Sequence, residues 1–277
     1  MSDALVAAAN PNKALWEKGD FTRIAQTMRQ SGEDLVDGLG VGAGMEILDL
    51  GCGDGTTAVP MAQRGAAVIG VDIAENLVAA GNERARSAGL TNLRFQQGDA
   101  AELAQIDDAS FDLVLSVFGA MFAPRPADVA SEMVRVTRPG GRIVMGNWIP
   151  GDPTLVAQIL KISSAFAPPP PEGFVSPMTW GDEAVVRQRF EAAGIAPANI
   201  RCEPATYAFR HPGPPAELLT LFRTYYGPTM NAFEAAAKDG RASQLEDQLT
   251  ALFEDQNRGG SRTEIPATFL KVTVEKS

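Results

Sequence analysis

The stretch ILDLGCGDG, residues 47–55, decides how this chain folds. The apolar residues 46–50 run directly into three closely spaced glycines, which is typical of a buried parallel strand that turns sharply into a helix. Glycines at such a turn let the backbone approach a ligand closely. A dinucleotide-binding turn has the pattern G-x-G-x-x-G, but here the third glycine comes one residue early and Thr56 takes its place. We therefore predict a ligand-binding turn between a strand and a helix.

Strands and helices alternate from this turn onward for about a hundred residues. The apolar runs predict strands at residues 67–71, 93–97, 111–117 and 142–147, and helical patterns predict helices at 56–64, 75–88 and 126–136. This alternation predicts a doubly wound α/β fold, with a parallel sheet and helices on both faces.

The pattern changes after residue 150. We predict helices near residues 154–166 and 182–193 and two more strands at 200–210 and 267–274. Between these strands, apolar residues recur at helical spacing over residues 214–257. We interpret residues 211–262 as a helical cap inserted into a domain formed by residues 41–210 and 263–277. Residues 1–40 form a further predicted unit, a helical segment that covers the ligand.

Acidic residues stand at the predicted ends of three consecutive strands. Asp49, Asp72 and Asp99 point into the crevice where open α/β sheets bind ligands. Asp49 and Asp54 would repel a pyrophosphate and favour a cation. S-adenosylmethionine carries an ammonium and a sulfonium and has no phosphate, so the charges favour it over NAD. Asp72 is placed to bind ribose hydroxyls, and Asp99 to accept a hydrogen bond from adenine. Any one of these acids would also suit a helix cap.

The composition of the chain argues against several kinds of partner and against some cellular compartments. The 277 residues include 24 basic and 34 acidic side chains, a net charge of −10 that argues against binding nucleic acid. Cys52 and Cys202 are too few for a disulfide framework and fit no metal-binding pattern. The start of the chain lacks the basic flank of a signal peptide, and the longest apolar stretch, residues 113–123, is too short for a membrane span. We expect a cytoplasmic protein with no membrane partner and no metal.

Five segments together resemble a known family. They are ILDLGCGDG (47–55), VIGVDIAENLV (68–78), QQGDA (96–100), SFDLVLSVFGAMF (110–122) and RVTRPGGRIVMGNW (135–148). In this order and spacing they resemble the class I S-adenosylmethionine-dependent methyltransferases with a type 11 domain. They are most similar to the group that includes the ubiquinone and menaquinone biosynthesis methyltransferases. The resemblance implies a Rossmann-like, seven-stranded, mostly parallel sheet with one antiparallel strand near the C-terminus.

The resemblance also implies roles for particular residues. Asp49 and the backbone of Gly51 and Gly53 would hold the methionine end of S-adenosylmethionine, and Asp72 its ribose. The full set of implied cofactor-binding residues is Asp49, Gly51, Cys52, Gly53, Asp72, Ile73, Asp99, Ala100, Ser116 and Val117. Residues 16–21 resemble the segment that such enzymes fold over the cofactor, although Trp16 would serve equally well as a core anchor.

The methyl acceptor is less well defined by the sequence. The apolar loop after the fourth strand predicts a small, apolar or aromatic metabolite. We predict that its pocket contains Met121, Phe122, Trp180, Tyr225 and Tyr226. His211 is the only histidine and the candidate general base, since its intrinsic pKa of about 6.5 suits that role. A histidine that merely packs in its proline-rich corner is an equally good interpretation.

Two other functions compete with methyl transfer. An NAD(P)-dependent oxidoreductase could share the fold, but the glycine spacing, the acid after the third strand and the lack of a Tyr-x-x-x-Lys pair argue against it. A protein that binds S-adenosylmethionine without turnover is the other alternative. The sequence leaves open whether the chain is a monomer or a homodimer, because the aromatic residues of the cap suit either a pocket or an interface.

Overall fold

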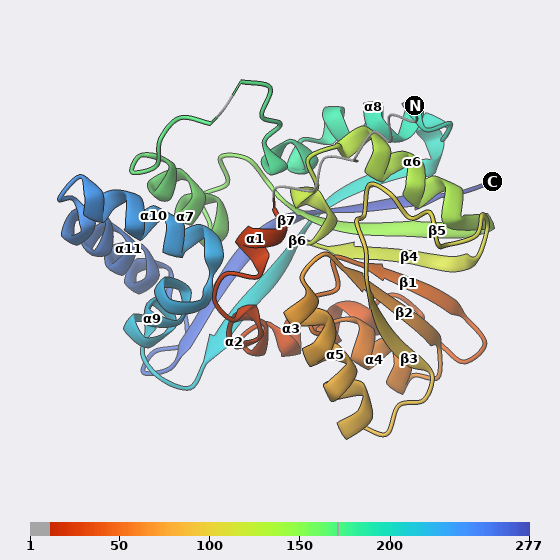
Figure 1. Cartoon of the computed structure of the whole chain (residues 1–277), viewed down its shortest axis with the longest axis horizontal. Coiled ribbons are helices and arrows are strands. Elements are labelled where there is room, and N and C mark those ends of the chain that lie inside the picture. Colours follow the sequence, from red (N-terminus) through yellow and green to blue (C-terminus); the bar gives the residue numbers. More distant parts are fainter. Residues whose placement is uncertain (1–11, 171) are drawn as a thin grey trace, which may run out of the picture.

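The computed structural model describes residues 12–170 and 172–277 and contains one mixed seven-stranded sheet (Figure 1). The strands are β1 (Glu46–Leu50), β2 (Ala67–Asp72), β3 (Leu93–Gln97), β4 (Phe111–Val117), β5 (Thr137–Trp148), β6 (Ile200–His211) and β7 (Thr263–Glu275). Their order across the sheet is β3-β2-β1-β4-β5-β7-β6, and β7 alone runs antiparallel to its neighbours. This confirms the predicted doubly wound fold and its antiparallel strand near the C-terminus.

Helices cover both faces of the sheet. They are α3 (Arg29–Asp37), α4 (Ala58–Gln63), α5 (Glu75–Ser87), α6 (Pro126–Val136), α7 (Leu155–Ser164) and α8 (Glu183–Ala192). Short 3-10 turns η1 (Ala120–Phe122), η2 (Pro177–Gly181) and η3 (Pro197–Asn199) join them. The central strand β1 is buried on both faces, with Ile47 in one apolar cluster and Leu48 and Leu50 in the other. Burial on both faces explains why this strand is a continuous apolar run.

Two short helices from the start of the described chain cross the open edge of the fold. These are α1 (Lys13–Trp16) and α2 (Phe21–Gln26), which lie in front of the sheet in Figure 1. Lys18, in the turn between them, donates hydrogen bonds to Asn231 and Glu234 in the insert. Residues 1–11 of the predicted N-terminal segment lie outside the described residues. The part that is described bridges the sheet and the insert.

Three helices occupy the range predicted for the insert between β6 and β7. They are α9 (Pro215–Tyr225), α10 (Gly227–Lys238) and α11 (Ala242–Gln256). The helical spacing predicted two apolar stripes, of which Leu218, Phe222, Leu245 and Leu249 are buried, whereas Tyr225 and Leu252 are half-buried. α11 packs against α7 and α9, and α9 packs against α2, so the insert lies over the extended ends of β6 and β7 (Figure 1).

Two strands begin earlier than their apolar patterns predicted. β7 starts at Thr263 because it pairs with β6 as far as His211, through residues 263–266, which form no apolar run. β5 starts at Thr137, and its glycine turn bonds to the last strand, since Gly140 donates to the carbonyl of Lys276. Backbone pairing, which side-chain patterning does not reveal, therefore sets these two boundaries.

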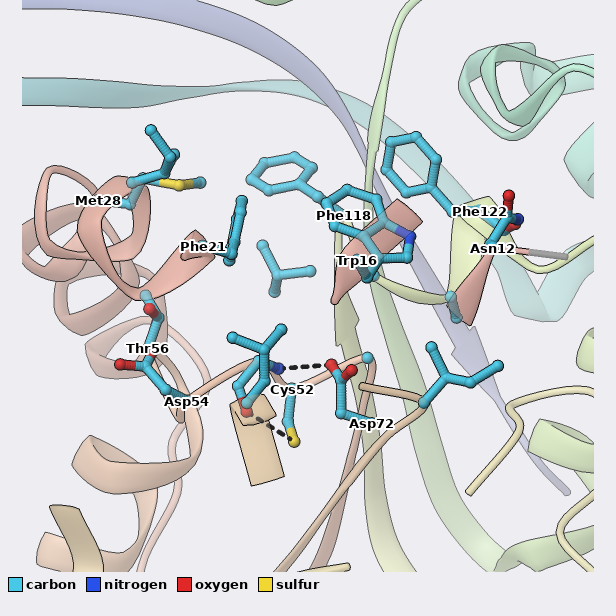
Figure 2. Close-up of a pocket in the computed structure, with 18 of the residues that line it drawn as sticks. Asn12, Trp16, Phe21, Met28, Cys52, Asp54, Thr56, Asp72, Phe118 and Phe122 are labelled. Carbon is cyan, nitrogen blue, oxygen red and sulfur yellow. Dashed lines mark hydrogen bonds between the residues drawn. The ribbon is translucent and has the colours of Figure 1, made fainter. Parts of the chain in front are cut away.

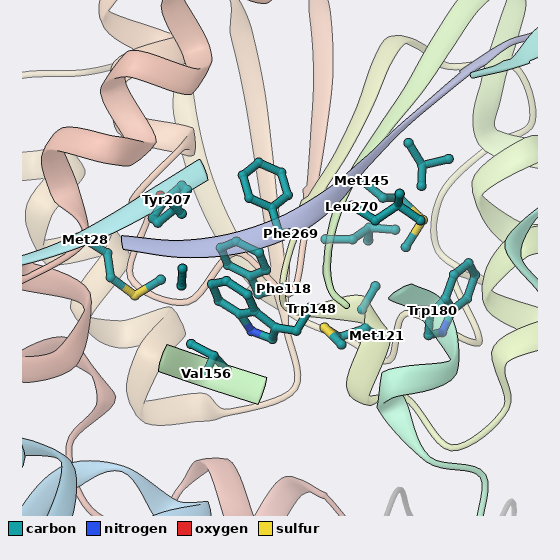
Figure 3. Packing of buried hydrophobic residues seen from close by; sticks show 14 of the residues in the cluster. Met28, Phe118, Met121, Met145, Trp148, Val156, Trp180, Tyr207, Phe269 and Leu270 are labelled. Atoms are coloured by element: carbon teal, nitrogen blue, oxygen red, sulfur yellow. The ribbon is translucent and has the colours of Figure 1, made fainter. Parts of the chain in front are cut away.

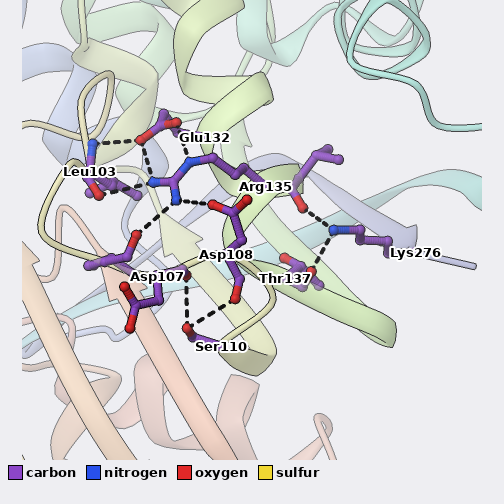
Figure 4. Close-up of polar contacts among 10 residues, drawn as sticks. Leu103, Asp107, Asp108, Ser110, Glu132, Arg135, Thr137 and Lys276 are labelled. Atoms are coloured by element: carbon purple, nitrogen blue, oxygen red, sulfur yellow. Dashed lines mark hydrogen bonds and ion pairs between the residues drawn. The ribbon is translucent and has the colours of Figure 1, made fainter.

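The loop after β3 is fixed to α6 by a polar network (Figure 4). Arg135 donates to Glu132, Asp108 and the carbonyl of Leu103, and Glu132 in turn accepts from the Leu103 amide at 2.7 Å. Hydrogen bonding to Arg135 lowers the pKa of Glu132, so this carboxylate stays charged. The network holds the loop that carries Asp99. Among the described helices, none is long and apolar enough to cross a membrane.

Candidate functional site

A pocket opens at the carboxyl ends of the parallel strands (Figure 2). Its floor consists of the loops that follow β1, β2, β3 and β4, which together form the crevice at the point where the strand order reverses. Residues of α1 and α2 cover it from one side, and α7, β6 and α9 supply the remaining wall. Polar side chains gather near the β1 and β2 loops, and aromatic side chains near the β4 loop.

Two glycines in the loop after β1 serve different purposes. A Cβ on Gly51 would lie 2.5 Å from the Cα of Gly119, so the β1 and β4 loops touch through their backbones. A Cβ on Gly53 would meet only the ring of Phe21, at 4.0 Å, beside the pocket. Both residues have positive φ, +63° and +56°, which favours glycine. Gly51 therefore lets two loops meet, whereas Gly53 leaves space for a ligand.

Asp72 stands at the end of β2 and lines the pocket. Its Oδ2 accepts the Gly53 amide at 2.8 Å and its Oδ1 accepts the Ala74 amide at 2.9 Å. Each carboxylate oxygen can accept a second hydrogen bond, so the group remains able to bind two hydroxyl donors. Burial raises the pKa of Asp72, because a charged carboxylate loses its solvation there.

Asp49 is not part of the pocket lining, although it was predicted to hold the ligand. Its Oδ2 accepts the Thr57 hydroxyl at 2.6 Å, beneath the first turn of α4. Side chains alternate along a strand, and Asp49 lies on the Ile47 side of the sheet. Complete burial raises the pKa of Asp49 to about 7. Asp49 thus anchors the glycine loop from below.

Most of the other predicted cofactor residues line the pocket. Cys52, Ile73, Asp99, Ala100 and Val117 belong to its wall. Asp99 also accepts the Ala101 amide at 2.9 Å, which shapes the loop after β3.

Ser116 is placed differently from its neighbour Val117. It is buried outside the lining, where its hydroxyl donates to the Leu50 carbonyl at 2.7 Å and accepts the Ala120 amide at 3.0 Å. Ser116 therefore joins β1 to the β4 loop. Ser116 supports the pocket floor from below and does not line it.

Aromatic side chains form the half of the pocket next to the β4 loop. Phe118 stacks on Trp148 with ring centres 3.6 Å apart and planes 9° from parallel, and Tyr207 meets Phe118 edge-on. Phe118 has φ +63°, an uncommon conformation for a bulky residue that occurs at functional sites. Trp16 closes the same region by packing on Phe122, at 4.8 Å between ring centres.

Two of the five predicted acceptor residues, Phe122 and Tyr226, line this aromatic half, and three do not. Met121 faces the core between Trp148 and Trp180 (Figure 3). Trp180 packs against Phe190 under the guanidinium of Arg189. The third residue outside the lining is Tyr225, which directly precedes Tyr226.

Tyr225 is this third residue outside the lining. Its backbone carbonyl abuts the turn at Gly19. Tyr225 is the last residue of α9, whereas Tyr226 follows it in an extended conformation and lines the pocket.

His211 lies outside the pocket lining as well. Its Nε2 is 3.0 Å from a carboxylate oxygen of Glu217, on the first turn of α9. This contact joins the end of β6 to the insert. Within the described part of the chain, no three histidine, cysteine or acidic side chains come together as metal ligands would.

Several pocket residues received no site role in the sequence analysis. They are Thr56, Phe118, Trp148, Tyr207, Phe209 and Phe222. Phe21 and Asp54 also line the pocket, and the sequence had placed Phe21 in the segment that folds over the cofactor and Asp54 in the charge cluster of the glycine loop. Tyr207 and Phe209 are two positions apart in β6, so the sequence indicated that they share one face of a strand. It did not indicate that this face lines a pocket. Phe118 and Trp148 each stand one residue beyond a predicted strand, where ligand-binding residues concentrate in open sheets.

The strand order and the pocket define a class of protein. This is the Rossmann-like group, whose members bind ligands in the crevice outside the carboxyl ends of the strands. A methyltransferase domain model matches residues 48–145, the segment that carries β1 to β5. An uncharacterised protein of Mycobacterium tuberculosis is 31% identical over 248 residues, which cover 89% of this chain and 88% of that protein. A ubiquinone biosynthesis O-methyltransferase of Acinetobacter baumannii is 35% identical over 36% of this chain and 43% of its own length.

Solved structures share the fold. The YcgJ protein of Bacillus subtilis has a TM-score of 0.58 at 19% identity, covering 90% of this chain and 99% of that one. Phosphoethanolamine N-methyltransferase 2 of Haemonchus contortus, solved with S-adenosylmethionine, has a TM-score of 0.56 at 17% identity and covers 90% of this chain and 52% of that one. Residues 48–145 therefore form a methyltransferase domain of the type 11 family. The chain is an enzyme that uses S-adenosylmethionine as its cofactor.

Proposed function

We propose that this enzyme methylates a small apolar or aromatic metabolite, bound in the aromatic half of the pocket. The observation that carries the proposal is the composition of that half. Its wall consists of Trp16, Phe21, Phe118, Phe122, Trp148, Val156, Ile159, Leu160, Phe209, Phe222 and Tyr226. Burying apolar surface against such a wall stabilises an apolar ligand, whereas a charged ligand would lose its hydration there.

We assign the opposite half of the pocket to the cofactor. Asp72 binds the ribose hydroxyls with its remaining lone pairs, and Asp99 and Ala100 flank the adenine. Gly53 leaves room for the methionine end with its sulfonium. S-adenosylmethionine bound there would supply a methyl carbon on a cationic sulfur; an acceptor aligned with the carbon–sulfur bond would take the methyl group, and neutral S-adenosylhomocysteine would leave. The residues of the chain align the two partners and exclude water, and these are the main requirements of that displacement.

Tyr226 and Tyr207 are the phenols of the pocket wall. Burial raises the pKa of both phenols above their usual value of about 10, so both stay protonated at neutral pH. A protonated phenol donates a hydrogen bond and does not remove a proton. We therefore assign Tyr226 to orienting an acceptor oxygen, and we assign no catalytic role to His211.

A labelling experiment tests the choice of acceptor. The enzyme is incubated with methyl-labelled S-adenosylmethionine and a bacterial metabolite extract, and the products are separated by polarity and size. We expect enzyme-dependent label in small molecules that partition into organic solvent. Label confined to polar metabolites, protein or nucleic acid would contradict the proposal.

A matched pair of variants links the label to the pocket. Leu160 and Leu221 are both half-buried helical leucines, but only Leu160 lines the pocket. Leu160→Asn should reduce transfer to the apolar acceptor and leave binding of S-adenosylhomocysteine unchanged, because it lies in the acceptor half. Leu221→Asn should leave both unchanged.

The remaining assignments concern partners and location. The net charge of −10 supports a protein that does not bind nucleic acid, because like charges repel. Cytoplasmic location, and a monomeric or homodimeric state, stay predictions of the sequence. Sedimentation and fractionation of the native host test them.

A further inference from the structure

The aromatic half of the pocket contains a hydrogen-bond donor in surroundings without charge. Tyr226 is 7% exposed, and its hydroxyl makes no hydrogen bond within the described residues. The rings of Trp16, Phe21 and Phe222 pack around it, with ring centres 5.3–6.1 Å from its own. None of these neighbours carries a charge or ionises near neutral pH. The Tyr226 hydroxyl therefore has a proton to donate to a ligand in this half.

The acidic side chains of the pocket stand in the other half. Figure 2 shows Cys52, Asp54 and Asp72 on one side of the pocket and the labelled aromatic rings on the other. Asp72 and Asp99 follow β2 and β3, which are two and three places from β4 in the sheet, so these strand ends lie roughly 10 and 14 Å from that of β4. Asp54 is already paired with Arg29, and burial raises the pKa of the Cys52 thiol well above its usual range. A general base has to lie within about 3 Å of the proton that it takes, so none of these groups serves the aromatic half.

Two other polar side chains line the pocket near the aromatic rings. The Tyr207 hydroxyl lies at α3, since a Cβ on Gly32 would be 2.9 Å from it, and burial raises the pKa of Tyr207. The Asn12 amide donates to the carbonyl of Phe122. A protonated phenol and an amide donate hydrogen bonds and do not remove protons. Within the described part of the pocket, the aromatic half thus offers donors and no base.

We propose that the acceptor is an acidic phenol or enol that loses its proton to water before it binds, and that Tyr226 donates a hydrogen bond to the resulting oxyanion. A lone pair of the oxyanion forms a bond to the methyl carbon, the carbon–sulfur bond breaks, and its electron pair stays on sulfur. One negative and one positive charge thereby give a neutral methyl ether and neutral S-adenosylhomocysteine. This inference rests on the proposed function, because it names the chemical class of the apolar or aromatic acceptor.

The apolar wall suits this reaction, although it penalises a lone charge. Opposite charges attract each other several times more strongly at the low dielectric of a buried site than in water. The cationic sulfur and the Tyr226 hydroxyl together replace the hydration that the oxyanion loses. Because both charges shrink as the methyl group moves, an apolar wall destabilises the reactants more than the transition state. A separate base in this half is therefore unnecessary.

A series of phenols tests the proposal. The unmodified enzyme receives methyl-labelled S-adenosylmethionine and one of four phenols, which in order of rising hydroxyl pKa are pentafluorophenol, 4-nitrophenol, 4-cyanophenol and phenol. We expect kcat/KM to fall about tenfold per pH unit below the pKa of each phenol, so the acid limb of the profile moves with the acceptor. An acid limb at the same pH for all four would show that a group of the enzyme takes the proton, and the proposal would be wrong. Absence of transfer to every one of them would contradict it as well.

Tyr226→Phe and Tyr225→Phe form a matched pair of variants. Tyr226→Phe keeps the ring and removes the donor, so kcat/KM for 4-nitrophenol should fall by about 10- to 100-fold, the loss expected for a hydrogen bond to a charged group. Its affinity for S-adenosylhomocysteine should stay unchanged, because that ligand occupies the other half. Tyr225 lies outside the lining, so Tyr225→Phe should change neither quantity. Normal turnover in Tyr226→Phe, or an equal loss in both variants, would show that Tyr226 does not hold the oxyanion.

The labelled metabolite extract separates this inference from the proposed function. Label in products that partition into organic solvent, together with an acid limb that is the same for all four phenols, would overturn the oxyanion alone. Label confined to polar products would overturn the proposed function and this inference together.

Discussion

At the scale of single residues, Gly53 and Gly119 show why the pocket needs glycine at two kinds of position. Gly119 touches the backbone of Gly51, whereas Gly53 faces open pocket. We predict that Gly119→Ala lowers the free energy of unfolding by roughly 1–3 kcal/mol, the usual cost of overpacking. Gly53→Ala should cost about 1–2 kcal/mol for its positive φ. It should also weaken S-adenosylhomocysteine by more than about tenfold, or ~1.4 kcal/mol.

Thermal unfolding measures the stability of each glycine variant, and calorimetry on the same samples measures its affinity for S-adenosylhomocysteine. The stated loss of affinity is predicted for Gly53→Ala. Normal ligand affinity in a folded Gly53→Ala protein would show that the cofactor does not pass over this residue.

Asp72 provides a second prediction at this scale. Asp72→Ala should weaken S-adenosylhomocysteine by about 1.5–3 kcal/mol, because the ribose hydroxyls lose a charged acceptor. Asp72 also binds the amides of Gly53 and Ala74, so circular dichroism must show that the variant folds. An unchanged dissociation constant in a folded variant would remove Asp72 from the cofactor site.

The burial of Asp49 predicts a dependence of stability on pH. The folded protein raises the pKa of Asp49 from about 3.8 to about 7, so between these values the folded state binds more protons than the unfolded state. The contribution of this group to stability is therefore greatest below pH 4 and is lost as the pH rises towards 7.

We expect Asp49→Asn to remove this loss, because an amide can still accept from Thr57 and carries no charge. At pH 8 the variant should be more stable than the wild type by at most about 4 kcal/mol, and the two should converge near pH 4. Urea unfolding across pH 4–8 measures the difference. An equally steep pH profile in the variant would mean that Asp49 is not the group responsible.

The acids also show what sequence can predict about a site. Asp72 and Asp99 were placed in the pocket correctly by their position, since the ends of parallel strands meet at one edge. Asp49 lies one residue before its strand ends, where side-chain alternation turns it away from the pocket. Asp54 appeared in sequence only as part of a charge cluster. The burial of its side chain beside the pocket becomes visible only in three dimensions.

At the scale of elements, the segment from α1 to α2 acts as a strap between the sheet and the insert. Its turn at Gly19 has φ +77°, and a Cβ there would lie 2.8 Å from both the Met230 sulfur and the Tyr225 carbonyl. Trp16 and Phe21 of the strap line the pocket. A displaced strap should therefore open the pocket without unfolding the sheet.

We predict that Gly19→Ala increases hydrogen exchange in residues 13–26 and weakens S-adenosylhomocysteine. Gly89→Ala is the matched control, since Gly89 has φ +67° and a Cβ there would contact nothing within 4 Å. Both variants incur the same backbone strain, but only Gly19→Ala clashes with the insert. Equal effects of the two variants on ligand affinity would argue against a strap.

The insert shows the limit of periodic patterns at this scale. Helical spacing predicted two apolar stripes, and four of their members are fully buried, namely Leu218, Phe222, Leu245 and Leu249, whereas Tyr225 and Leu252 are half-buried. The same spacing does not say which buried residues face a cavity. Phe222 lines the pocket, whereas Met121 and Trp180 lie in the core. Burial follows from one helix alone, whereas a pocket depends on how several elements meet.

At the scale of the whole molecule, one sheet edge brings two chemically different surfaces together. The loops of β1 to β3 supply the acidic side, and the insert, strap and β4 loop supply the aromatic side. The order of strands was predictable because alternation and glycine turns are local signals. The contacts that join strap, sheet and insert link residues more than 200 positions apart, such as Lys18 and Glu234, and no local pattern reports them.

Calorimetric titration of the unmodified chain with S-adenosylmethionine, S-adenosylhomocysteine and NADH tests the central claim most directly. The acidic side of the pocket favours a cationic nucleoside cofactor and repels a pyrophosphate. The account predicts one site per chain that binds S-adenosylmethionine, with S-adenosylhomocysteine as a competitor and no heat from NADH. Binding of NADH, or no binding of S-adenosylmethionine by the folded protein, would contradict it.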